Sequence, residues 1–287
     1  AQRGGPEVLR PGIAAVPAPK PDEVLIRVAA AGVNRPDIAQ RSGNYPPPPG
    51  ASPLIGLEVA GEVVAAGAEV RAYKIGDRVC ALTNGGGYAE YCVAPQAQTL
   101  PWPKGYDALR AAAVPDTYVT VWASLFMSGR LAKGETVLVH GGTSGIGVTA
   151  LQLAAAFGAT AYATAGSDDK VAACVKLVAA AGINYRTQDF GAEIKTLTGG
   201  RGVDVILDMV GGDYVERNIR CCADDGRIVN IAYQKGSKVS LDLIRVMLKR
   251  LTLTGSTLRI RTSAVKAQIA RAVEAQAYAD PAFAPGR

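Results

Sequence analysis

The stretch from Thr136 to Ser167 limits the possible folds more than any other, because it contains no Asp, Glu, Lys or Arg. Its length alone would allow a membrane span. However, its apolar surface is interrupted by Gln152, by several threonines and by a series of glycines, at Gly141, Gly142, Gly145, Gly147 and Gly158. The sequence therefore predicts a buried strand, a glycine-rich turn, a buried helix and a second strand, in a protein without membrane spans.

The glycines lie between a predicted strand at 136–140 and an apolar helix over 149–157. Gly142, Ser144 and Gly147 match the dinucleotide-binding spacing G-x-G-x-x-G, with serine at the second glycine. Such a turn lets the backbone approach a pyrophosphate, and the helix N-terminus offers unpaired N–H groups to the phosphates. The same glycines would also suit a closely packed strand–helix joint without a ligand. The predicted phosphate-binding residues are Gly142, Thr143, Ser144, Gly145 and Ile146.

From about Pro115 on, apolar runs alternate with segments of helical spacing, such as "SDDKVAACVKLVAAAG" and "SLDLIRVMLKR". Strands joined by helices require parallel crossovers. The expected fold class is therefore α/β, with a Rossmann-type doubly wound parallel sheet covered on both faces, and the glycine turn lies where the strand order reverses. The six predicted strands are at 136–140, 160–165, 183–185, 203–210, 227–232 and 251–255.

The first third of the chain has a different pattern. The short valine-rich segments "DEVLIRVAAAGV", "LEVAGEVVAAG", "GDRVCALT" and "YAEYCVAP" are separated by Gly, Pro and Asp. This punctuation is typical of short strands joined by tight turns. We expect a small irregular barrel or sandwich here, and two domains in a chain of 287 residues.

A serine in a strand-to-helix turn could also be the nucleophile of a hydrolase. The nucleophile elbow requires G-x-S-x-G, whereas Ser144 is followed by Gly145 and Ile146. The single histidine, His140, precedes the serine, so the order serine, acid, histidine is absent. These residues exclude a Ser-His-Asp hydrolase, and they predict that His140 is a packed residue at the end of a strand.

The end of the second predicted strand bears on the choice between NAD and NADP, because NAD-selective sites carry an acidic residue there. Here Gly166 and Ser167 are followed by Lys170, and small residues with a cation suit the 2′-phosphate of NADPH. Asp168 and Asp169 oppose this interpretation unless they lie in the first turn of a helix, where negative charge is favourable. Lys170 could otherwise be an ordinary surface lysine.

The net charge of +6 could indicate nucleic-acid binding, with a candidate footprint of Arg245, Lys249, Arg250, Arg259, Arg261, Lys266 and Arg271. No recognition motif accompanies these residues, so we expect solvated helix faces and attraction for a phosphate-bearing cofactor. The five cysteines, with Cys221 beside Cys222, fit neither a disulfide framework nor a zinc knuckle. No apolar leader segment is visible, and we expect a cytoplasmic protein.

The segment "GVNRPDIAQRSGNYPPPPGASPLIGLEVAGEVVAAG", from Gly32 to Gly67, together with the glycine turn, resembles the quinone oxidoreductase branch of the medium-chain dehydrogenase/reductase superfamily, the zeta-crystallin-like proteins. The similarity runs from Pro6 to about Arg261. It implies a GroES-like catalytic domain over residues 1–117, with a return segment at 259–287. It also implies a Rossmann-type NADPH-binding domain over residues 118–258.

The resemblance also implies roles for individual residues. Asn34 and Tyr45 match polar residues that face the nicotinamide and the substrate, and Thr120 matches a threonine near the nicotinamide ribose. Without the family, Asn34 and Asp37 could be turn or cap residues, and Tyr45 a packed loop aromatic. The residues that match those holding the adenosine 2′-phosphate are Gly166, Lys170 and Tyr185.

Zinc is not expected. In the zinc-dependent relatives the position of Leu57 carries a histidine ligand, and a four-cysteine structural lobe is present. Here Leu57 is apolar, and Cys80 and Cys92 have no close companions with zinc-finger spacing. The resemblance therefore implies a zinc-independent reductase with no metal.

The expected reaction is transfer of a hydride, or of single electrons, from NADPH to a quinone. Asn34 and Tyr45 would be its catalytic residues, because they could orient the acceptor and donate hydrogen bonds to its developing oxyanion. One alternative is an NADPH-dependent enoyl or 2-alkenal reductase, in which Tyr45 would donate a proton. A non-enzymatic alternative is an NADPH-binding protein with a nucleic-acid-binding or structural role.

The segment "RLTLTGS", from Arg250 to Ser256, is expected to be the last strand of the parallel sheet. An uncovered edge strand of this kind favours pairing across a two-fold axis. The sequence therefore predicts a homodimer.

Overall fold

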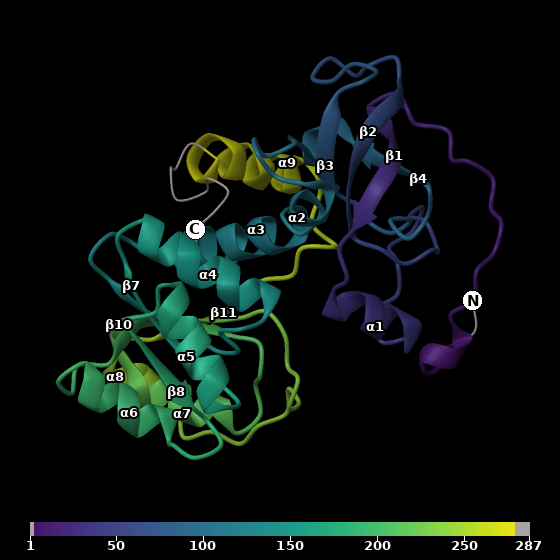
Figure 1. The fold of residues 1–287 in the computed structure, drawn as a ribbon. Helices are drawn as coiled ribbons and strands as arrows, with labels where there is room; N and C mark the ends of the chain where they lie inside the picture. The colour runs from purple at the N-terminus through teal and green to yellow at the C-terminus, as the bar shows by residue number, and fades with distance from the viewer. Residues whose placement is uncertain (1–2, 279–287) are drawn as a thin grey trace. The chain divides into compact units, whose positions relative to one another are not determined.

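The computed structural model describes residues 3–278, which divide into two compact units (Figure 1). Unit 1 contains the residues up to Val119 and those from Leu258 onward, and unit 2 runs from Thr120 to Thr257. The part of the predicted return segment from position 279 on lies outside the described residues. Across residues 3–278, no helix combines the length and the apolar character needed to cross a membrane.

Unit 1 is built on an antiparallel sheet with the strand order β4-β1-β2-β3-β5. The strands are β1 (Glu23–Ala31), β2 (Glu58–Ala66), β3 (Arg78–Leu82), β4 (Tyr91–Pro95) and β5 (Thr99–Pro101). The helical elements are η1 (Pro6–Val8), α1 (Arg35–Arg41), η2 (Gln96–Gln98), α2 (Ala108–Ala112), α9 (Ser263–Ala272) and η4 (Val273–Ala277), with α3 (Pro115–Val121) running across the boundary between the units.

The core of unit 1 comes from the valine-rich segments. Val24 and Ile26 on β1 pack with Val59 and Val63 on β2 and with Val79 on β3, and all five are nearly or fully buried. Shifts in register interrupt the pairing of β1 with β2, which increases the local twist of the sheet. The sequence prediction of short strands with tight turns in a GroES-like β-rich unit is confirmed.

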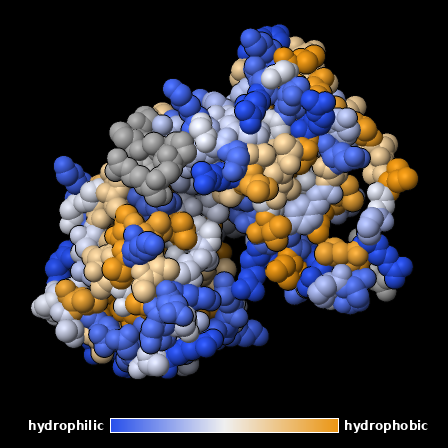
Figure 2. All heavy atoms as spheres, viewed as in Figure 1, coloured by the Kyte–Doolittle hydropathy of each residue, from blue (hydrophilic) through white to orange (hydrophobic). Residues whose placement is uncertain are grey.

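The chain between η1 and β1 is extended and lies away from this core. Leu9, Ile13 and Val16 expose their side chains there. In Figure 2 orange apolar spheres lie along this segment at the right of the view. Their apolar groups add little to the stability of unit 1, because only apolar surface that is removed from water contributes.

Unit 2 contains a parallel sheet with the strand order β11-β10-β9-β6-β7-β8. Its strands are β6 (Thr136–Val139), β7 (Thr160–Ala165), β8 (Ala181–Asn184), β9 (Val203–Asp208), β10 (Cys222–Asn230) and β11 (Thr252–Gly255). Its helical elements are the π-helix η3 (Trp122–Ser128), α4 (Gly145–Ala156), α5 (Asp168–Leu177), α6 (Phe190–Leu197), α7 (Tyr214–Cys221) and α8 (Ile244–Leu248). This is the doubly wound order, which reverses between β6 and β9.

Helices cover both faces of the parallel sheet (Figure 1). Leu138 and Ile206 point to one face, where they form a buried cluster with Phe190 of α6 and Ile219 of α7. Because side chains alternate along a strand, Val137 and Val205 point to the other face, which α4, α5 and η3 cover. The α/β fold class predicted from the sequence is confirmed.

Several elements are shorter or longer than the sequence suggested. The helix in the segment after Gly166 ends at Leu177, because the chain is already back in the sheet at Ala181. Strand β10 begins at Cys222, ahead of the predicted run at 227–232. Its pairing with β9 is irregular between Cys222 and Arg227, where Asp225 has a left-handed backbone. No residue pattern predicted the π-helix η3.

Candidate functional site

The turn after β6 needs glycine for two separate reasons. Gly141 has a φ of +69°, a left-handed conformation that side chains disfavour. A Cβ on Gly147 would lie 2.3 Å from the carbonyl oxygen of Gly141, which no real contact tolerates. The first turn of α4 therefore lies directly against the backbone that leaves β6, as the dinucleotide-binding turn requires.

Ser144 closes this turn as the N-cap of α4. Its Oγ accepts a hydrogen bond from the N–H of Gly147 at 3.0 Å and donates one to the carbonyl oxygen of Gly141 at 2.8 Å. The N–H groups of Gly145 and Ile146 precede the first intrahelical bonds, and they make no hydrogen bond within residues 3–278. The first turn of α4 also has no acidic residue. The turn therefore fits a pyrophosphate.

A buried network of polar side chains contacts the backbone of the turn at Gly141. His140 is fully buried; its Nε2 donates to Oδ1 of Asn218 at 2.8 Å, because an amide oxygen can only accept. Its Nδ1 lies 3.1 Å from Oγ1 of Thr164, which in turn accepts from the N–H of Gly141. Burial lowers the pKa of His140, so the ring is neutral. His140 is a packed residue at the end of β6, as the sequence predicted.

Sequence reasoning missed the other members of this network. Asn218 donates to Oδ2 of Asp208 at 3.1 Å, and Asn230 donates to the same oxygen at 3.0 Å. These residues lie on α7, β9 and β10, far apart in the sequence. The only local signal was the polar character of Asp208, which directly follows the apolar run Val205 to Leu207 of β9.

The predicted 2′-phosphate residues gather at the carboxyl end of β7. Tyr185 lies against Gly166, since a Cβ at position 166 would be 2.6 Å from the tyrosine Oη. Ser167 is the N-cap of α5, and its hydroxyl makes no capping hydrogen bond. Lys170 follows in the first turn of α5 with an exposed side chain. Small residues, a hydroxyl and a cation are thus brought together.

The two acidic residues near this corner lie in the first turn of α5, as the sequence predicted. Oδ1 of Asp168 accepts a hydrogen bond from Nδ2 of Asn184 at 2.7 Å. That carboxylate is therefore held by β8, and Asp169 is exposed. Neither residue follows directly after β7, where an NAD-selective site would place its acid.

Thr120 and Thr143 are the remaining predicted cofactor residues of unit 2. Thr120 is half-buried near the end of α3, and its carbonyl oxygen accepts from Ser124 Oγ at 2.7 Å. Thr143 is exposed within the glycine turn. No hydrogen bond within residues 3–278 joins Thr120 to that turn.

In unit 1, Asn34 is held tightly at the N-terminus of α1. Its Nδ2 donates to Oε1 of Glu58 at 2.7 Å, and its backbone N–H donates to Oδ2 of Asp37 at 2.9 Å. The capping role considered for Asp37 is confirmed. The second predicted catalytic residue, Tyr45, lies in the loop after α1, where the guanidinium of Arg259 is 5.0 Å from its ring centre.

Glu58 is the main unit 1 residue that sequence reasoning missed. It is almost fully buried at the start of β2, and its Oε2 accepts from the N–H of Asp116 at 2.8 Å. Burial, reinforced by the charge of Asp116, raises the pKa of Glu58 to about 8. A glutamate between the apolar residues of "GLEVAGEVV" was a usable signal, because a buried carboxyl there must find polar partners.

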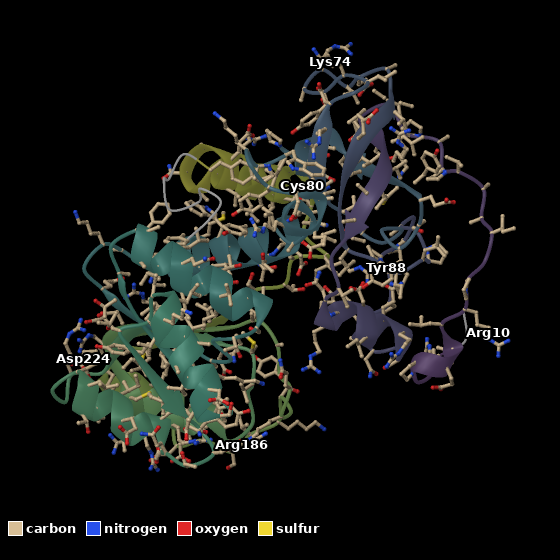
Figure 3. The ribbon with its side chains drawn as sticks, in the orientation of Figure 1. Arg10, Lys74, Cys80, Tyr88, Arg186 and Asp224 are labelled. Atoms are coloured by element: carbon tan, nitrogen blue, oxygen red, sulfur yellow. The ribbon has the colours of Figure 1, made fainter. Side chains whose placement is uncertain are left out.

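Asp37 is also buried and joins α1 to two other segments. Its Oδ1 accepts from the N–H of Gly56 at 3.0 Å. Its Oδ2 accepts a hydrogen bond from the hydroxyl of Tyr88 at 3.0 Å. Tyr88 lies next to α1 (Figure 3). Two carboxyl groups therefore fix the position of Asn34. Asp37 is close to it in the sequence, whereas Glu58 is not.

The position that holds zinc in metal-dependent relatives does not fit a metal here. Leu57 is buried and has no donor atom. Within residues 3–278, no group of three His, Cys, Asp or Glu side chains could hold a metal ion.

A doubly wound sheet with a glycine turn of the dinucleotide-binding pattern after its first strand, together with a GroES-like unit, is typical of two-domain oxidoreductases that use a nicotinamide nucleotide. The family described as "Alcohol dehydrogenase GroES-like domain" matches residues 20–104, and "Zinc-binding dehydrogenase" matches residues 145–275. The chain belongs to the quinone oxidoreductase branch of the medium-chain dehydrogenase/reductase superfamily.

Three comparisons illustrate this membership. A quinone oxidoreductase from Rattus norvegicus is 37% identical over 228 residues, which cover 79% of this chain and 69% of the relative. The structure of Escherichia coli quinone oxidoreductase complexed with NADPH has a TM-score of 0.84 at 30% identity, covering 96% of this chain and 86% of the other. A structure described as an NAD-dependent alcohol dehydrogenase also has a TM-score of 0.84, at 33% identity, with 96% and 87% covered.

The contact at Gly147 generates the first prediction. Gly147→Ala should open the turn and weaken nicotinamide-nucleotide binding at least about tenfold, which corresponds to about 1.4 kcal/mol. Titration of the cofactor by fluorescence measures this affinity. Gly12→Ala is the matched control, because a Cβ at position 12 meets nothing within 4 Å. Equal affinities in the two variants would contradict the assigned turn.

The buried carboxyl generates the second prediction. Folded Glu58 keeps a proton that the unfolded chain loses above its ordinary pKa, so its contribution to the free energy of unfolding falls between about pH 5 and 8. Glu58→Gln cannot ionise, and its stability relative to the parent should rise over this range. Urea unfolding can follow unit 1 through Trp102 in a Trp122→Phe background.

Glu62→Gln is the control for this measurement. Glu62 lies on the same strand but is only half-buried, in a surface ion pair with Arg27. Its difference from the parent should show no such trend with pH. If the free energy of unfolding depended on pH in the same way for Glu58→Gln and the parent, Glu58 would be ionised in the folded protein.

Proposed function

We propose that this protein is a zinc-independent, NADPH-dependent quinone oxidoreductase. The observation that carries the proposal is the corner at the carboxyl end of β7. There Tyr185 packs against Gly166, and the Ser167 hydroxyl makes no capping hydrogen bond. Lys170 supplies a positive charge, and Asp168 is held by Asn184. A 2′-phosphate gains from a nearby cation, whereas NAD would leave Lys170 without a ligand. The names of the quinone oxidoreductase relatives support the choice of acceptor.

The residues of unit 2 would bind the cofactor. The turn of Gly142, Thr143, Ser144, Gly145 and Ile146 would hold the pyrophosphate through its backbone N–H groups. In the same arrangement Thr120 would lie near the nicotinamide ribose, and Tyr185 would lie over the adenosine end. The bound nicotinamide supplies the hydride, and the protein supplies alignment and the exclusion of water.

The residues of unit 1 would act on the acceptor. Glu58 and Asp37 hold Asn34 in one orientation, so that its amide can point at the acceptor without losing entropy at each turnover. Asn34 and Tyr45 would donate hydrogen bonds to the oxygen on which negative charge develops. A quinone suits such a site, because its product anion is stable and needs no dedicated acid.

An enoyl or 2-alkenal reductase is the alternative enzyme on this scaffold. That reaction must add a proton to carbon after the hydride, and Tyr45 would have to donate it. A nucleic-acid-binding role has less support, because four of the seven basic residues considered for it are already engaged. Lys249 caps carbonyl groups at the end of α7, Arg250 pairs with Asp225, and Arg259 and Lys266 are buried.

Oxidation of NADPH and NADH with a set of quinones and enals tests the function. We expect turnover with quinones and a preference for NADPH. Lys170→Ala should reduce that preference about 10- to 100-fold, because a charged hydrogen bond to the phosphate contributes about 1.5 to 3 kcal/mol. Lys176→Ala, in the last turn of the same helix, is the control. An unchanged ratio would refute the phosphate role, and turnover of enals alone would favour the alternative.

We also propose a homodimer that forms through β11. This strand pairs only with β10 among the described strands, so one edge of its backbone is uncovered. Exposed apolar side chains lie on and near it, at Leu243, Ile244, Met247, Leu248 and Leu253. Such a surface with a free edge suits a second copy of the chain across a two-fold axis.

Light scattering should give twice the mass of the chain. Met247→Lys should weaken the dimer, because it places a charge in the buried interface. Leu197→Lys is the control, since Leu197 is exposed on α6, away from β11. A monomeric parent protein would overturn the proposal.

We propose a cytoplasmic location as well. All five cysteines are free and buried, which suits a reducing compartment.

A further inference from the structure

Two buried cations of unit 1 form no ion pair with a carboxylate of the described residues. Arg259 is 6% exposed and Lys266 is 2% exposed. Within residues 3–278 neither side chain forms an ion pair. Burying a charge without a partner is costly, so a cation retained in this way calls for an explanation.

Neutral oxygen atoms hold both cations in place. Arg259 donates to Oε1 of Gln40 at 2.7 Å and to the carbonyl oxygen of Asn84 at 2.8 Å. Lys266, on α9, donates to Oδ1 of Asn84 at 2.7 Å and to the carbonyl oxygen of Arg259 at 3.0 Å. Nε of Arg259 is buried and forms no hydrogen bond to any residue that the structure describes. The pair is thus fixed in position by hydrogen bonds to neutral atoms. The carboxylate whose charge acts on Arg259 is that of Asp37, which forms no direct ion pair with it.

The third set of contacts made by Arg259 is to Tyr45. Nη1 donates to the carbonyl oxygen of Tyr45 at 3.0 Å, and the guanidinium carbon lies 5.0 Å from the centre of the tyrosine ring. One side chain therefore holds both the backbone and the ring of this loop residue. A cation against the ring also makes the phenol a stronger hydrogen-bond donor, because it draws electron density from the ring.

We propose that Arg259, supported by Lys266, is a positioning residue that orients Tyr45 and biases it towards hydrogen-bonding an anionic oxygen of the acceptor. The inference rests on the proposed function. Addition of a hydride to a quinone delivers two electrons and leaves one negative charge on a quinone oxygen, which takes a proton from solvent when the product leaves. The fixed positive charge favours this anion through Tyr45.

A double-mutant cycle of Arg259→Gln and Tyr45→Phe tests the inference. With a quinone, Arg259→Gln should lower kcat about 10- to 100-fold. This is less than the roughly 100- to 1,000-fold loss when a donor that touches the oxyanion is removed, because Arg259 acts through Tyr45. The KM for NADPH should stay within about twofold, because a positioning residue of unit 1 acts after the cofactor binds. In the Tyr45→Phe background, the same change should cost less than about threefold.

The control is Arg271→Gln, which removes an exposed arginine of α9 and should leave kcat unchanged. Arg259→Lys provides a second variant if the glutamine variant does not fold. Lysine keeps the charge but cannot make the three contacts, so kcat should fall about 3- to 10-fold, again only when Tyr45 is present. Equal losses with and without the Tyr45 hydroxyl, in whichever variant folds, would overturn the proposal.

The two proposals fail in different ways. A parent protein that oxidises NADPH with no quinone would refute the proposed function. A parent protein that turns over quinones, combined with additive effects of the Arg259 and Tyr45 variants, would refute the role of Arg259 alone.

Discussion

The approach of Gly147 to the carbonyl oxygen of Gly141 is the contact on which the cofactor unit depends. Only two backbones without side chains can come this close, and the contact places the start of α4 at the end of β6. The unpaired N–H groups then face the point where the strand order reverses. Ser144, His140 and Thr164 are arranged around this contact, and their hydrogen bonds fix the shape of the turn.

Unit 1 achieves the same rigidity with buried polar groups instead of glycines. Glu58 and Asp37 lock Asn34, while Arg259 locks Tyr45. In both cases a buried ionisable group, which is costly to remove from water, holds a neutral side chain that is proposed to contact the acceptor. The acidic pair and the cationic pair lie around different residues, which suggests a division of tasks. Asn34 is oriented, whereas Tyr45 is both oriented and polarised.

Local patterns were sufficient wherever the controlling interaction lies within a few residues. The spacing of Gly142 to Gly147, the small residues after β7 and the helical placement of Asp168 all follow from short-range rules of turns and caps. The positions of Glu58 and Arg259 did not follow, because their partners are distant in sequence. Glu58 meets the N–H of Asp116, and Arg259 meets Tyr45 across most of the chain.

By itself, the sequence determined that the chain has a β-rich part, a doubly wound parallel sheet and a glycine turn for a dinucleotide. Those features follow from hydrophobic periodicity and from residues without side chains, and both are local properties. Only the tertiary structure decided which polar side chains are buried together and which charges remain unpaired. Burial and pairing are set by neighbours that the fold supplies, so the state of Glu58, His140 and Arg259 could not be derived from their own surroundings in the sequence.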